Sequence, residues 1–256
     1  MAERPEWARQ VGAGVRFEWG LTGARVLGPE CAAIVVVDVL SFTTAVSVAI
    51  DAGTRVFPYP ARDHTAGEFA LAQDARLAVG RRAVTAEHPW SLSPAALRSA
   101  PVPERLVLPS PNGSAIAAAV GGVPVIAACL RNATAVGQWI VKQGWGTAER
   151  PVGVIAAGEH WPGREVLRPA IEDLLGAAAV IDAMVAQGVG PLSAEARSAR
   201  NAYLGERDVA ATVTDCASGR ELAAIGFGAD VAAAVEIDSS SSVPVLADGA
   251  FADATA

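Results

Sequence analysis

Four segments of the chain repeat one pattern, in which an apolar run is followed by a short polar turn and then by an amphipathic run. The segments are residues 32–52, 104–120, 123–143 and 152–187. Two further, shorter strands are predicted at 15–19 and 55–58, and the pattern over about 62–77 predicts a helix. Strands that alternate with helices predict an α/β fold. We expect a largely parallel or mixed sheet with helices on both faces, in a three-layer α/β/α arrangement.

The pattern changes after residue 188. Residues 193–238 predict several short helices, so we expect a helical C-terminal part, and residues 239–251 predict one late strand. The stretch 85–103 is rich in proline and serine. A stretch of this length without a clear period predicts a long loop or a lid beside the site.

The polar turns of the four segments follow their strands directly. Their sequences are "DVLSFTT", "PSPNGS", "LRNAT" and "AGEHWPGRE". Right-handed crossovers between parallel strands place such turns at one edge of the sheet. Ligands of α/β sheets bind outside the carboxyl ends of the strands, so we expect the four turns to converge on one site.

Asp38 closes the first apolar run and is the first candidate site residue. A carboxylate at the end of a buried strand is costly unless it is hydrogen-bonded, paired or bound to a metal ion. Asp38 can hold Mg²⁺ or attack phosphorus as a nucleophile. It can equally accept N–H bonds from the next helix as a cap. The pattern leaves these readings open.

Asn112 and Gly113 form a turn between a strand and a helix. Backbone N–H groups at such a position can hold an anion. The alternative is a tight turn in which Asn112 or Ser114 caps the helix. The turn at Asn132 has the same character.

Glu172 and Asp173 lie at the start of the helix that follows Pro169. As an isolated acidic pair they are explained by a favourable interaction with the helix dipole. The other hypothesis is that they face Asp38 across the strand edge and complete a Mg²⁺ site. Arg164 lies in the preceding edge turn, where an arginine either binds an anionic substrate or is a solvated surface charge.

Composition narrows the class of protein. The chain has 256 residues, of which 52% are hydrophobic and 18% charged, so a sizeable core is expected. We expect a single domain over 1–256, with subdomains at about 1–150 and 151–256 as the alternative. The net charge of −7 argues against nucleic acid or an anionic membrane as the main partner. No apolar run is long enough for a membrane span and no signal segment is evident, so we expect a soluble cytoplasmic protein.

Cysteine and histidine offer little sign of metal or thiol chemistry. The three cysteines lie far apart in apolar surroundings, which favours buried packing, and no histidine has the spacing of a zinc ligand. These residues are Cys31, Cys129, Cys216, His64, His88 and His160. No Gly-x-Gly-x-x-Gly follows any strand, which argues against a dinucleotide-dependent oxidoreductase.

Five motifs in order resemble the 2-phosphosulfolactate phosphatases over about residues 30–246. They are "VVVDVLSFTTAVSVAI", "PSPNGSAIA", "LRNATAV", "IEDLLGAAAVID" and "SGRELAAIGF". The resemblance implies an α/β fold and a Mg²⁺-dependent phosphatase. That enzyme converts 2-phosphosulfolactate to 3-sulfolactate in coenzyme M biosynthesis. Two positions depart from the family pattern: Ser41 stands where arginine is usual, and Ser114–Ala115 stands where Thr-Arg is usual.

The resemblance turns the open readings into one hypothesis. Asp38, Glu172 and Asp173 are the expected catalytic and Mg²⁺-binding residues. The expected substrate-binding residues are Ser41, Thr43, Thr44, Asn112, Gly113, Ser114, Asn132 and Arg164. The expected partner is a small anionic phosphorylated substrate, and a homodimer is left open. The alternative is a family member that has lost catalysis and only binds a phosphorylated or carboxylated metabolite.

Overall fold

The computed structural model describes residues 5–61 and 63–256, and it confirms the expected α/β class. The strands among these residues are β1 (Val15–Trp19), β2 (Ala33–Val37), β3 (Arg55–Tyr59), β4 (Arg76–Leu77), β5 (Arg105–Pro109), β6 (Val125–Ala128), β7 (Val152–Ala156), β8 (Glu159–His160), β9 (Leu167–Arg168), β10 (Pro244–Ala247) and β11 (Ala250–Asp253). The α-helices are α1 (Gly20–Leu27), α2 (Phe42–Asp51), α3 (Thr65–Ala72), α4 (Pro94–Ser99), α5 (Gly113–Ala119), α6 (Ala133–Lys142), α7 (Ile171–Val185), α8 (Ala194–Gly205), α9 (Val209–Asp215), α10 (Ala217–Ala224) and α11 (Gly228–Ala234). Short 3-10 helices are η1 (Glu6–Arg9), η2 (Gly28–Glu30) and η3 (Arg81–Ala83).

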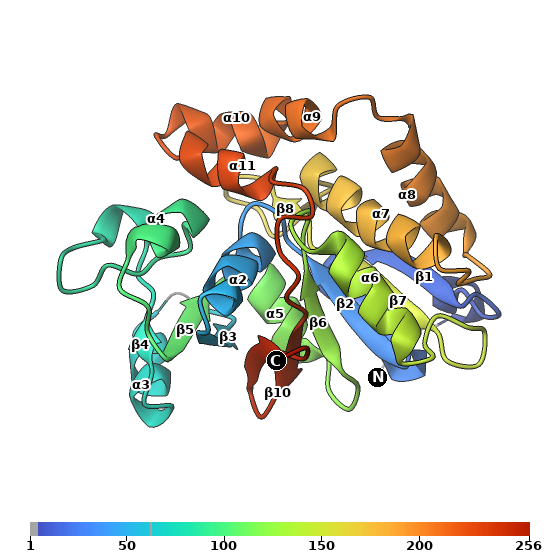
Figure 1. The fold of residues 1–256 in the computed structure, drawn as a ribbon, viewed down its shortest axis with the longest axis horizontal. Coiled ribbons are helices and arrows are strands. Elements are labelled where there is room, and N and C mark those ends of the chain that lie inside the picture. Colours follow the sequence, from blue (N-terminus) through green and yellow to red (C-terminus); the bar gives the residue numbers. More distant parts are fainter. Residues whose placement is uncertain (1–4, 62) are drawn as a thin grey trace.

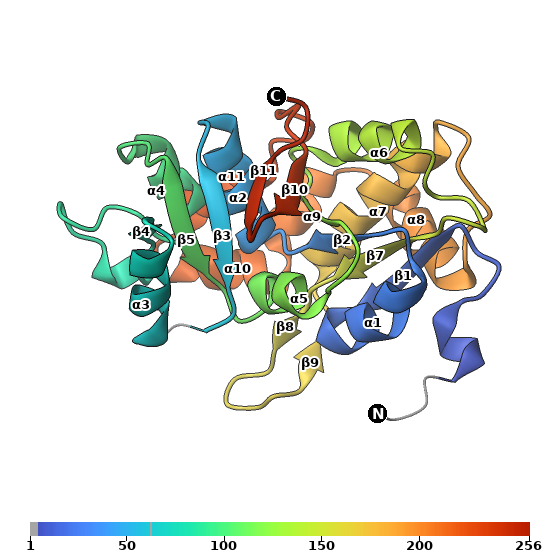
Figure 2. The same cartoon turned by 90° about the horizontal axis from the view of Figure 1, so that it is seen from below.

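A mixed nine-stranded sheet runs through the molecule in the order β1-β7-β2-β6-β10-β11-β3-β5-β4 (Figures 1 and 2). Strands β1, β7, β2 and β6 are parallel to one another, and so are β3, β5 and β4. The antiparallel hairpin β10–β11 lies between these two groups. The C-terminal hairpin therefore joins two parallel half-sheets into one.

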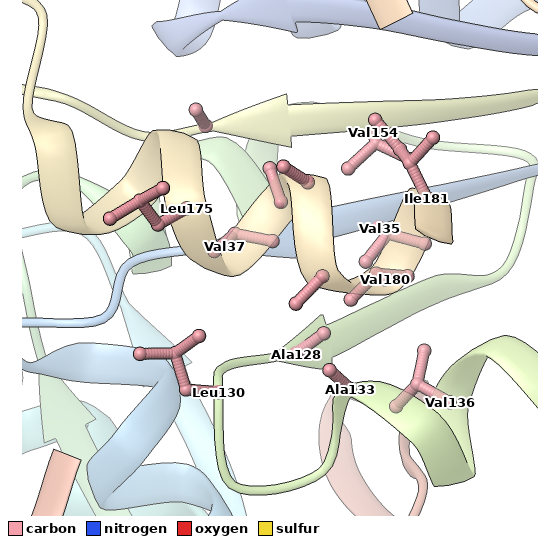
Figure 3. Packing of buried hydrophobic residues seen from close by; sticks show 14 of the residues in the cluster. Val35, Val37, Ala128, Leu130, Ala133, Val136, Val154, Leu175, Val180 and Ile181 are labelled. Carbon is pink, nitrogen blue, oxygen red and sulfur yellow. The ribbon is translucent and has the colours of Figure 1, made fainter. Parts of the chain in front are cut away.

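Strand β2 lies inside the first parallel group and is buried on both faces. Val35 and Val37 contact the cluster formed by α6 and α7, while Ile34 and Val36 contact the cluster that includes α1 and α5. Figure 3 shows Leu175, Val180 and Ile181 of α7 over β2 and β7. Two-sided burial explains why the β2 sequence is an uninterrupted apolar run.

Register aligns the carboxyl ends of the neighbouring strands. Val37, the last residue of β2, pairs with Ala128 of β6 and with Ala156 of β7. The turns after these strands therefore begin at the same edge of the sheet, as the sequence predicts. Helix α10 lies above this edge, followed by α11 (Figure 1).

Two predicted elements differ from the structure. The helix expected over 62–77 is α3 alone: Arg62 lies outside the described residues, and residues 76–77 form β4 beside β5. Asp74 takes a positive φ of 48°, which ends the helical course of the chain. The late strand expected within 239–251 is a hairpin of two strands, because Asp248 and Gly249 both adopt positive φ and reverse the chain.

The segment 193–238 forms the short helices α8 to α11, as predicted. The stretch 85–103, predicted as a long loop or lid, is irregular except that it contains α4. No helix in the described ranges has the length and apolar character needed to cross a membrane.

Gly176 sets how closely α7 approaches β2. A Cβ at this position would lie 2.6 Å from Val39 Cγ2 and 2.9 Å from Val37 Cγ1. Both valines are fully buried and have no space to move. Gly176→Ala should therefore lower the free energy of unfolding by about 1–3 kcal/mol, measured by urea denaturation.

The matched control for this prediction is Gly205→Ala at the end of α8, where an added Cβ meets no atom within 4 Å. Its stability should be unchanged or slightly raised, because alanine favours the helix. Equal stability of the two variants would contradict close α7–β2 packing.

Candidate active site

A cleft of about 810 Å³ opens at the carboxyl edge of the sheet. Three of the four predicted polar turns contribute to its wall, and α10 covers it. The polar residues of the wall are Asp38, Ser41, Arg81, Ser110, Asn112, Glu159, His160, Arg168, Glu172, Ser218 and Glu221. The predicted convergence is therefore observed for these three turns.

Asp38 follows β2 at the floor of the cleft and is 4% exposed. Its Oδ1 accepts the Phe42 N–H at 3.1 Å, and its Oδ2 accepts the Gly113 N–H at 2.8 Å. The carboxylate thus binds the first turns of both α2 and α5. The two readings of Asp38 are compatible, since the same group accepts helix N–H bonds and lines the cleft.

Gly113 is needed for this arrangement. A Cβ on Gly113 would lie 2.4 Å from Phe42 Cδ1 and 2.8 Å from Asp38 Oδ2. The absent side chain allows α5 to approach Asp38, and the Gly113 N–H is directed at that carboxylate. In this structure Gly113 therefore positions Asp38.

Three of the predicted hydroxyl groups bind the backbone around the site. Thr43 Oγ1 accepts the Asp38 N–H at 3.0 Å and donates to the Asp38 carbonyl at 2.8 Å. Thr44 Oγ1 donates to the Val39 carbonyl at 2.7 Å, and Ser114 Oγ donates to the Leu108 carbonyl at 3.1 Å. These side chains are buried and hold the turns in place.

Asp173 connects two of the edge turns. Its Oδ1 accepts the Val39 N–H at 2.7 Å, and its Oδ2 accepts the Gly158 N–H at 2.8 Å. Burial raises the pKa of this carboxyl well above its usual range, and the negative charges of Asp38 and Glu172 add to the effect. Asp173 does not line the cleft. Its contacts are those of a residue that positions the turns after β2 and β7.

Glu172 precedes Asp173 on α7 and lines the cleft, although it is only 1% exposed. Its Oε2 accepts a hydrogen bond from the Cys216 thiol at 3.2 Å. Cys216, which the sequence assigns to packing, is thus a neighbour of a cleft carboxylate. Burial raises the pKa of the Cys216 thiol to about 11, so at neutral pH the thiol acts as a hydrogen-bond donor.

Glu159 is a cleft residue that the sequence interpretation missed. Its Oε2 accepts a hydrogen bond from Asn112 Nδ2 at 3.0 Å, and Asn112 Oδ1 lies 3.2 Å from His160 Nδ1. Burial raises the pKa of the Glu159 carboxyl to about 7, and the negative charge of Asp38 contributes to the shift. The signal was available, because Glu159 follows a buried strand closely, as Asp38 does.

Asn132 and Arg131 occupy the fourth turn, which lies outside the cleft wall. Asn132 Nδ2 donates to the Ser242 carbonyl at 3.2 Å, and Arg131 forms ion pairs with Asp51 and Glu236. Residues that precede β10 cover this turn. Its predicted convergence with the other three is therefore not observed, because the C-terminal segment packs against it.

The arginines that line the cleft are not the one predicted from the sequence, Arg164. Arg164 lies exposed in the loop of the β8–β9 hairpin, which projects from the body of the molecule (Figure 2). Arg168 lines the cleft and donates to Ser218 Oγ at 3.1 Å. Arg81 lines it from η3, where its Nη2 donates to Ser41 Oγ at 2.7 Å. Of the predicted substrate-binding residues, Ser41 and Asn112 line the cleft.

The carboxylates of the cleft are suitable ligands for a hard cation, which prefers oxygen. Asp38, Glu159 and Glu172 all line the cleft. Burial raises the pKa of Glu159, and the negative charges of Asp38 and Glu172 add to this effect. Among the residues described, no group of three His, Cys, Asp or Glu side chains is close enough to enclose a metal ion. Mg²⁺ does not require such a cage, because it commonly uses one or two carboxylates with water and substrate phosphate.

The sequence matches a known protein family over most of its length. A family model described as 2-phosphosulpholactate phosphatase matches residues 26–249. No curated protein matches the chain.

The pKa of Glu159 predicts how metal-free stability depends on pH. The folded protein holds this proton up to a pKa of about 7, whereas the usual value is 4.5. Between these values the folded state binds more protons than the unfolded state, so stability falls as the pH rises. The loss from Glu159 should reach up to about 3 kcal/mol by pH 7.5, measured by urea denaturation in EDTA.

Glu159→Gln should reduce this pH dependence, and Asp173 should maintain the part that remains, because its shift has the same sign. The exposed residue Glu195 on α8 provides the control variant Glu195→Gln, which should keep the full dependence. An identical pH profile for both variants would refute the assignment to Glu159.

Proposed function

Because the chain belongs to the 2-phosphosulfolactate phosphatase family, which consists of phosphoric monoester hydrolases, we propose that it is a Mg²⁺-dependent phosphatase of a small anionic metabolite. The proposed reaction converts 2-phosphosulfolactate to 3-sulfolactate and phosphate, a step of coenzyme M biosynthesis. The observation that carries the proposal is the convergence of four carboxylates and two arginines on one cleft. A cytoplasmic location and a homodimer stay predictions from the sequence.

Asp38 and Glu172 are the proposed Mg²⁺ ligands. Both are nearly buried and both line the cleft, so each can present oxygen to a cation next to the substrate. Bound Mg²⁺ would neutralise phosphate charge and polarise the phosphoryl group. Asp173, predicted as a third ligand, has each oxygen bound by a backbone N–H and lies outside the cleft wall. We assign it the positioning of Val39, next to Asp38.

Glu159 is the proposed general acid. A carboxyl with a pKa of about 7 is substantially protonated at neutral pH and can give its proton to a leaving group. Asn112 donates to Oε2, which leaves Oε1 to carry the proton. As the P–O bond to the alcohol breaks, this proton passes to the alcohol oxygen, and water supplies the oxygen that joins phosphorus.

Asp38→Asn tests the metal site. The exchange removes the negative charge and places an amide where two N–H groups are directed, so turnover of 2-phosphosulfolactate should fall by at least about 100-fold. Mg²⁺ affinity, measured by titration calorimetry, should fall with it. Asp215→Asn, at the exposed end of α9, is the control and should retain both. Retention of activity and Mg²⁺ affinity by the Asp38 variant would disprove the assignment.

Glu159→Gln tests the general acid through the leaving group. With an alkyl phosphate the alcohol needs the proton, so kcat should fall by about 100-fold or more. With p-nitrophenyl phosphate the departing phenolate is stable on its own, and the loss should be clearly smaller. Equal losses for the two esters would argue that Glu159 has another role.

Assays of phosphate release and ligand binding distinguish the proposed phosphatase from the alternative, a family member that binds a phosphorylated or carboxylated metabolite without catalysis. Mg²⁺-dependent phosphate release that EDTA abolishes supports the enzyme. Thermal stabilisation by the phosphate ester without any release of phosphate supports the binding protein.

A further inference from the structure

Arg81 stands between two cavities. It lines the main cleft and also a second cavity of about 320 Å³, whose wall includes Leu77, Val79 and Leu92. Leu92 likewise belongs to both walls. Arg81 is therefore at the boundary where the polar cleft meets a largely apolar compartment.

The guanidinium of Arg81 is held in place by its neighbours. Its Nε donates to Asp230 Oδ2 at 2.9 Å, its Nη2 donates to Ser41 Oγ at 2.7 Å, and the Phe227 ring centre lies 5.5 Å from its central carbon. Asp230 is 1% exposed and is itself fixed by the Ser93 hydroxyl. The arginine is therefore ordered before any ligand arrives.

One nitrogen of this guanidinium has no partner among the described residues. Nη1 of Arg81 makes no hydrogen bond there, and the Arg81 side chain as a whole is 16% exposed. A fixed guanidinium with an accessible N–H edge can bind a carboxylate or sulfonate with little further loss of side-chain entropy.

The proposed substrate carries a second negative group, which needs a cationic partner in the cleft. Its described wall carries four carboxylates, from Asp38, Glu159, Glu172 and Glu221, against only two guanidinium groups. Cation binding by carboxylates suits a phosphate, but it leaves a second negative group of the substrate without a partner. A guanidinium at the edge of the cleft provides one.

We propose that Arg81 binds the carboxylate or sulfonate of the substrate while the phosphate lies toward Asp38. The inference rests on the proposed function and names the residue that selects an anionic substrate body over a neutral one. The phosphate of the same substrate is proposed to lie in the main cleft, so the second anion binds on the cleft side of Arg81 and not in the side cavity that Asp63 lines.

The test compares two esters, 2-phospholactate and p-nitrophenyl phosphate, as a ratio of their kcat/KM values. Arg81→Gln should lower this ratio by about 10- to 100-fold, because the hydrogen bond it removes joins two charged groups. Arg82 is adjacent and exposed, so Arg82→Gln is the matched control and should preserve the ratio. An unchanged ratio in the Arg81 variant would overturn the proposal.

A binding measurement separates this proposal from the proposed function. Calorimetric titration with 3-sulfolactate requires no turnover, and Arg81→Gln should weaken the binding by a similar factor. Absence of phosphate release by the unmodified protein would then count against the phosphatase alone. Equal affinity in the two proteins, or no binding by either, would count against Arg81.

Arg81→Lys is a second variant that tests the proposal even if Arg81→Gln fails to fold. Lysine keeps the positive charge beside Asp230 but cannot bind Asp230 and a substrate anion with separate N–H edges, so the ratio of kcat/KM values should still fall. A lysine variant with the unmodified ratio would show that charge alone suffices, and would overturn the role of the guanidinium edge.

Discussion

The carboxylate of Asp38 is the interaction on which the rest of the site depends. It accepts one N–H from the first turn of α2 and another from the first turn of α5, so it connects β2 to two helices. Charge-assisted hydrogen bonds of this kind compensate for placing an anion at the end of a fully buried strand. Gly113 makes the second bond possible, because any side chain there would strike Asp38 and Phe42. The position of the cleft floor follows from these contacts.

The same edge gathers more negative charge than the fold requires. Burial raises the pKa of both Glu159 and Asp173. The negative charges of Asp38 and Glu172 add to this effect. Such a cluster lowers the free energy of unfolding of the metal-free protein as the pH rises. Packing of the fold alone gives no reason to accept this loss of stability. A cation at the proposed Mg²⁺ site of Asp38 and Glu172 would remove that loss. Stability and metal binding would then be coupled through the same carboxylates.

Local pattern was sufficient for the longer parallel strands and for the edge that carries the site, but not for the short strands β4, β8 and β9. The β2 run is apolar because it is buried on both faces, and the polar turns follow the strands for topological reasons. Asn132 shows where this reasoning ends, since residues just before β10 cover its turn from more than a hundred positions away in sequence. Glu159 could have been predicted by the criterion that selected Asp38, a carboxylate that closely follows a buried strand. The insertion of the β10–β11 hairpin between the two parallel groups of strands could not have been predicted from local pattern, because it depends on pairing across the whole chain.

Position 41 shows that the charges of a cleft have to be read from the residues that line it in three dimensions. The resemblance to the family leads one to expect an arginine there, and the sequence has serine. In the structure the Ser41 hydroxyl accepts a hydrogen bond from Arg81, so a guanidinium reaches the same neighbourhood from a segment forty residues away. Asp230 fixes that guanidinium from a third segment. A comparison position by position would conclude that the cation is lost, whereas the three-dimensional arrangement shows one supplied by other residues.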